Sequence, residues 1–153
     1  MALCLNLASV SQKSARITAM AEKFRTGNFD PHYTGYFKLF NEQKFYEAHD
    51  VLENLWLKDK HGSNGNFYKG LIQLAGAFVH LQKNRLKPSV ALFKLAQTNF
   101  EKYPRTHEHL DLQLTSQLIQ NWLGDLETSN FEKNPLVNGR APKLILDLPD
   151  DRK

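Results

Sequence analysis

The stretch that decides the fold lies at residues 45–56 and reads Phe-Tyr-Glu-Ala-His-Asp-Val-Leu-Glu-Asn-Leu-Trp. At about 100° per residue, its large apolar side chains collect on one side of a helix. His49 and Glu53 lie one turn apart within that side. The clearly polar residues point the opposite way: Glu47, Asn54 and Lys58. An ionisable pair that faces a core is costly unless it is paired, hydrogen-bonded or bound to an ion. The stretch therefore predicts a core helix and marks a site on it.

The same periodicity continues along the chain and predicts an all-α fold. Asp30-Pro31 is a strong helix start, because aspartate caps free amides and proline suits the first helical turn. Apolar spacing and the breaks between periodic stretches predict helices at about 30–41, 44–60, 66–83, 88–103 and 106–128. The helix at 66–83 is apolar almost all round, as expected of a central helix. We expect a single compact bundle of about five helices.

Two terminal segments flank this bundle. Residues 1–28 lack a capped, periodic helix that a core could anchor, so we expect a flexible N-terminal segment. Residues 29–133 are expected to form the helical bundle domain. From residue 134 onward the prolines forbid a long helix, and alternating leucines predict an extended C-terminal arm over 134–153.

Composition limits the class of protein and its partners. A net charge of +4 without a polybasic block argues against nucleic-acid binding. No stretch approaches the roughly 20 apolar residues of a membrane span. The single cysteine, Cys4, fits a reducing compartment, and we expect a cytoplasmic protein. Residues 1–21 contain no acidic residue, which leaves two interpretations open: an organellar targeting segment, or translation that starts at Met20.

The helix at 66–83 repeats the feature of the helix at 44–60. Between Gly70 and Leu81 its only polar side chains are Gln73 and His80, seven residues apart and so nearly aligned. Helices joined by a short loop usually pack as antiparallel neighbours. We therefore expect Gln73 and His80 to meet His49 and Glu53, with the two imidazoles within about 8 Å, the reach of a shared ligand or bridging water.

Three interpretations of this polar cluster stay open: a structural hydrogen-bond network, a metal or ligand site, and general acid–base catalysis. In the metal hypothesis His49 and His80 are ligands of a divalent ion of unassigned identity. Glu53 is a carboxylate ligand or the general base of a hydrolase, and Gln73 orients a water or substrate. Trp56 and Glu47 are counted with Gln73 among the residues that line the site. The alternative is a non-enzymatic helical module whose polar network fixes helix register while a groove binds a protein partner.

The remaining histidines are weaker candidates. His32 and His61 are expected to be exposed, the first after a proline and the second in a Gly-rich loop. His107 and His109 diverge by about 200° on a helix, so we expect solvated residues at a helix start. The partner, whether a small molecule or a protein, and the oligomeric state do not follow from the sequence.

The hallmark His49, Glu53 and Trp56 has the form H-x-x-x-E-x-x-W. With it, the chain resembles domain-of-unknown-function family 309, a family of small bacterial and archaeal proteins. The resemblance continues through Gly70-Leu71-Ile72-Gln73-Leu74-Ala75 and His80 and covers roughly residues 36–104. It implies a compact helical bundle and a metal-binding role for the motif, with no activity assigned.

Overall fold

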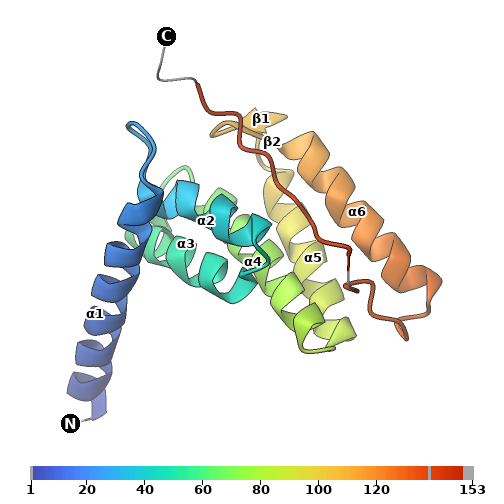
Figure 1. Ribbon diagram of the computed structural model, residues 1–153, viewed down its shortest axis with the longest axis horizontal. Coiled ribbons are helices and arrows are strands. Elements are labelled where there is room, and N and C mark those ends of the chain that lie inside the picture. Colours follow the sequence, from blue (N-terminus) through green and yellow to red (C-terminus); the bar gives the residue numbers. More distant parts are fainter. Residues whose placement is uncertain (1, 138, 150–153) are drawn as a thin grey trace.

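The computed structural model describes residues 2–137 and 139–149, and it describes side chains from Gln12 onward. This part of the chain is mainly helical, which confirms the all-α prediction (Figure 1). Its helices are α1 (Ala2–Ala21), a short 3-10 turn η1 (Glu22–Phe24), α2 (Pro31–Asn41), α3 (Phe45–Asp59), α4 (Gly65–Gln82), α5 (Leu86–Phe100) and α6 (Leu112–Thr128). A small antiparallel hairpin joins α5 to α6, with strands β1 (Thr106–His107) and β2 (Leu110–Asp111).

The predicted start at Asp30-Pro31 is present at the first residue of α2. Asp30 has an extended backbone, and its Oδ1 accepts a hydrogen bond of 2.8 Å from the backbone N–H of His32. Pro31 follows at the first helical position, where a missing N–H costs nothing. The helix ends before Gln43, whose φ of 62° cannot continue a right-handed helix. The turn directs the chain back, so α3 packs on α2.

Helix α4 lies at the centre of the core, as its apolar surface predicts. Its fully buried Phe78 contacts aromatic rings of four other helices. The partners and ring-centroid distances are Phe40 at 5.5 Å, Phe45 at 5.0 Å, Phe93 at 5.2 Å and Trp122 at 4.9 Å. Such aromatic pairs add about 0.5–1.5 kcal/mol each beyond their burial. One residue thus joins α2, α3, α5 and α6 through α4.

The small residues of α4 pack against α5. A Cβ on Gly70 would lie 2.7 Å from the Phe100 ring, and a Cβ on Gly76 would lie 3.2 Å from Leu92. Both neighbours belong to α5. These small residues therefore let α5 approach closely.

The last helix begins later than the expected residue 106. Glu108 and His109 have φ values of 47° and 65°, which form the hairpin turn between β1 and β2. The Tyr33 hydroxyl donates to the Glu108 carbonyl and so ties the turn to α2. Asp111 then caps α6, its Oδ1 accepting from the backbone N–H groups of Gln113 and Leu114. The contact between Tyr33 and Glu108 is tertiary and does not follow from local helix propensity. It overrides the helical pattern of residues 106–111.

Helix α1 has no counterpart in the sequence analysis, which expected no periodic helix within residues 1–28. It lies against α3 and α2, and its N-terminal end extends away from the other helices (Figure 1). Ala21 is fully buried, and Ile17 and Met20 pack against the core. Whether this segment is flexible in solution stays a prediction.

After α6 the chain is extended and crosses the bundle toward the hairpin (Figure 1). Leu144 is buried, and Leu146 forms an antiparallel bridge with Leu110 of β2. The described helices offer no segment that is both long enough and apolar enough to cross a membrane.

Candidate metal centre

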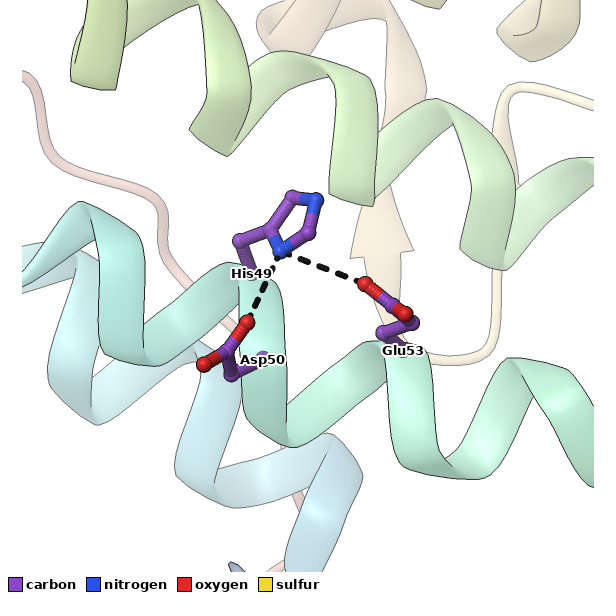
Figure 2. A group of neighbouring side chains, drawn as sticks. All are labelled: His49, Asp50 and Glu53. Atoms are coloured by element: carbon purple, nitrogen blue, oxygen red, sulfur yellow. Dashed lines mark hydrogen bonds and ion pairs between the residues drawn. The ribbon is translucent and has the colours of Figure 1, made fainter. Parts of the chain in front are cut away.

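Helix α3 presents three potential ligands on adjoining stripes of its surface. Residues at i and i+4 lie one above the other, and the residue at i+1 lies beside them. Nδ1 of His49 is 3.2 Å from Oδ1 of Asp50 and 3.5 Å from Oε2 of Glu53. Figure 2 shows both carboxylates directed at this nitrogen, one from each side. One donor atom from each residue lies within 4.8 Å of the other two.

These separations suit a shared metal ion. Bonds of about 2.1 Å to a tetrahedral ion separate neighbouring ligand atoms by about 3.4 Å. The two distances from Nδ1 bracket that value, and the two carboxylate oxygens lie within 4.8 Å of each other. Imidazole and carboxylate are also donor types that Zn²⁺ and related divalent ions accept. The donor set and its spacing therefore fit a divalent metal.

The three side chains are partly open to solvent. The exposed fractions are 31% for His49, 15% for Asp50 and 40% for Glu53. Next to them is a cleft of about 120 Å³ between α1 and α3, lined by Lys13, Ser14, Ile17, Asp50, Glu53, Asn54 and Leu57. A small molecule or an ion can reach the carboxylates from this side. The site is thus on the edge of the bundle and not in its core.

A lysine from α1 already contacts the cluster. Nζ of Lys13 lies 3.4 Å from Oδ2 of Asp50, the oxygen that His49 does not use. Lys13 is about half exposed, so this ion pair alone contributes little to stability. Its importance is positional, because it places a positive charge beside the potential ligands.

Two of the predicted lining residues lie on α3 outside this cluster. Glu47, in the first turn, is exposed. Trp56 is half-buried one turn beyond Glu53. The ring of Tyr46 stacks on that of His49 at a centroid distance of 6.4 Å, and Tyr46 is itself 55% exposed.

The residues expected from α4 are not part of the cluster. Oε1 of Gln73 accepts a hydrogen bond of 2.7 Å from Nδ2 of Asn99, so its amide is bonded to α5. His80 lies on nearly the same stripe as Gln73 and is absent from the donor group around His49. Within the described residues, Nδ1 of His80 is buried without a hydrogen-bond partner. Burial lowers the pKa of His80, and the charges of Arg85 and Lys83 lower it further.

Asp50 is the potential ligand that the sequence analysis missed. It directly follows His49 and precedes Glu53 by three residues, a spacing that puts it on the adjoining stripe of a helix. Only polar residues within the apolar face were considered as ligands, and Asp50 lies beside that face. A carboxylate at this position is nevertheless a sequence signal for a third ligand.

A second polar cluster lies at the junction of α1, α2 and α3. His32 is 5% exposed, contrary to expectation, and its Nδ1 is 2.8 Å from Oδ1 of Asp30. Nδ2 of Asn54 is 3.1 Å from Nε2 of His32 and donates to the Thr18 hydroxyl at 3.1 Å. Ser14 donates to Oδ1 of Asn54 at 2.6 Å. The sequence analysis left α1 out of the fold, so it assigned the polar face of α3 to solvent.

The segment that carries the cluster matches a known family model. Residues 33–92 match the model named Domain of unknown function (DUF309). This segment belongs to the DUF309 family. The DUF309 match covers α2, α3, α4 and the start of α5, and it includes His49, Asp50 and Glu53. Comparisons with curated proteins and with solved structures gave no match.

Proposed function

We propose that the chain is a metal-binding protein in which His49, Asp50 and Glu53 hold one divalent ion. The observation that carries this proposal is the position of two carboxylate oxygens 3.2 and 3.5 Å from the same imidazole nitrogen, at the edge of an open cleft. Three protein ligands with a further position open to solvent are typical of catalytic rather than structural metal sites.

A hydrolytic role is the extension of this proposal. A divalent ion bound there would supply Lewis-acid polarisation to a substrate group. Glu53 is the most exposed of the three ligands, so it is the one suited to exchange coordination for proton transfer. Lys13 is placed to attract an anionic part of a substrate.

One observation favours a second candidate, a non-enzymatic network that docks α1 on α3. Asp50 is shared between His49 and Lys13, and Ser14 and Thr18 of α1 are bonded to Asn54. In this case the cluster is complete without an ion and holds two helices together.

Metal titration of protein purified without an affinity tag and stripped with a chelator tests the proposal. We expect one equivalent of Zn²⁺ or Mn²⁺ to bind, detected by calorimetry. Asp50→Asn and Glu53→Gln should each lower the affinity at least about tenfold, the scale seen when ligand support is lost. Glu47→Gln is the matched control, because it makes the same chemical change on the same helix outside the cluster. His80→Gln tests the predicted ligand that the cluster does not contain.

Lys13→Gln separates the two candidates. The Lys13 ammonium competes with a metal for Asp50, so its removal should strengthen metal binding. In the docking network the same change removes a contact between α1 and α3, and neither the unmodified chain nor the variant binds Zn²⁺ or Mn²⁺. Unchanged metal content in Asp50→Asn and Glu53→Gln would reject the metal proposal. Leu52→Ala, a buried change on α3, should cost about 2–5 kcal/mol in either case and checks the stability assay.

A further inference from the structure

A cleft of about 530 Å³ lies away from the metal cluster, between η1, α2 and the C-terminal arm. Its volume falls in the range of small-molecule sites, roughly 300–1,000 Å³. Figure 1 shows the arm passing α2 on its way to the hairpin. None of the residues that line this cleft belongs to the group of His49, Asp50 and Glu53.

The wall formed by η1 is fixed on α2. Phe24 lies so close to Gly35 that a Cβ there would be 2.8 Å from its ring. The hydroxyl of Thr34 donates to the carbonyl of Phe24 at 2.7 Å. Gly35 is therefore required for this close approach, and the hydrogen bond holds the backbone of Phe24 on α2.

The opposite wall is fixed by Asn41, the last residue of α2. Its Nδ2 donates to the Leu144 carbonyl at 2.8 Å, and its Oδ1 accepts from the Leu144 N–H at 2.8 Å. An amide side chain thus binds the arm as a neighbouring strand would. Both walls are preformed, which limits the entropy lost when a ligand binds.

The lining combines apolar surface with positive charge. The apolar residues are Phe24, Phe37, Leu144, Ile145, Leu146 and Leu148. Among them Ile145 is 77% exposed, so its aliphatic side chain is open to an apolar ligand. The charged lining residues are Lys23, Arg25 and Lys38, and no acidic side chain lines the cleft.

Two of these cations are available to a ligand. Arg25 is already bonded to Glu22 through Nε at 2.7 Å and a terminal nitrogen at 2.6 Å. Lys23 and Lys38 form no ion pair within the part of the chain that the structure describes. The cleft therefore presents net positive charge beside apolar surface.

We propose that this cleft binds a small amphipathic anion, a carboxylate or phosphate monoester with an apolar body. Lys23 and Lys38 hold the anionic group, and the leucines of the arm with Phe24 cover the apolar part. This site is independent of the metal centre.

Titration of the full chain with probes of one chain length tests the requirement for negative charge. Octanoate and octyl phosphate represent the two anionic sources, while 1-octanol and octyltrimethylammonium carry neutral and positive groups. We expect saturable binding of the anions, weaker binding of octanol and the weakest binding of the cation. Amide NMR shifts should concentrate at residues 23–26 and 144–148 and leave α3 unaffected.

The double variant Lys23→Gln/Lys38→Gln should lower octanoate affinity about fivefold, the scale of two exposed ion pairs, and leave octanol binding unchanged. Lys94→Gln/Lys133→Gln, two exposed lysines elsewhere, is the matched control. Equal octanoate affinity in both double variants, or shifts centred outside the cleft, would overturn the proposal. Binding only to vesicles of anionic phospholipid, with none of monomeric octanoate, would also overturn it and assign this surface to a membrane.

Discussion

At the scale of single residues, the polar side chains of α3 and α4 lie on helix faces that meet different neighbours. His49, Asp50 and Glu53 are grouped at the edge toward α1, whereas Gln73 is bonded to α5. His49 and Glu53 could be predicted from the sequence because the helical repeat alone brings i and i+4 together. The positions of Gln73 and His80 on α4 could not be predicted. Which face of α4 meets α3 depends on the small residues of α4, because these let α5 approach closely.

His80 gives a prediction on pH dependence. Its pKa is lowered from 6.5 in the folded chain, first by burial and then by Arg85 and Lys83. The unfolded chain therefore binds the proton more readily, and stability falls as the pH drops from 6.5 toward the folded pKa. His80→Gln should flatten this part of the profile of unfolding free energy against pH, measured by urea denaturation. An unchanged slope in the variant would assign the pH dependence to other groups.

At the scale of elements, α1 is the main departure from the sequence prediction. The residues that attach α1 and the following η1 recur every three or four positions, Ile17, Ala21 and Phe24, which is a helical signal. Residues 1–28 were nevertheless not predicted to join the fold, because they lack an N-cap residue and because residues 1–21 have the composition of a targeting segment. Once α1 was left out, neither the burial of His32 nor that of Asn54 could be predicted.

Asn54→Ala tests the attachment of α1. The change removes the hydrogen bonds of Asn54 to Ser14, Thr18 and His32 at a site that is only 8% exposed. We expect a loss of about 1–3 kcal/mol in the free energy of unfolding, because the buried partners lose their hydrogen bonds. Gln120→Ala on the exposed face of α6 should change stability by less than about 0.5 kcal/mol. Faster proteolysis near α1 in Asn54→Ala, and not in the control, would locate the effect.

At the scale of the whole molecule, the bundle could be predicted because helical periodicity and turn residues are local features. The hairpin at residues 106–111 could not, because it depends on a contact between Tyr33 and Glu108 that lie 75 residues apart. The cleft beside the arm could not be predicted either, since it is formed by three segments far apart in the sequence.

Asn41→Ala tests how the arm is held. Both hydrogen bonds between Asn41 and Leu144 are lost, while the bridge from Leu146 to Leu110 is kept. We expect at least about tenfold faster hydrogen exchange at the Leu144 amide, equivalent to about 1.4 kcal/mol of local stability, with little change in the helices. Uniform acceleration throughout the core would instead indicate global destabilisation.

The pairing of Asn41 with Leu144 also constrains the order of events during translation. The two residues are separated by 103 positions, so at roughly 5–20 residues per second the side chain of Asn41 is made about 5–20 s before its partner. During that interval α2, α3 and α4 can already assemble around Phe78, while the groove beside α2 still lacks one wall. Helices α2, α3 and α4 can thus form on the ribosome, but the cleft is completed only when residues 144–148 have left the exit tunnel.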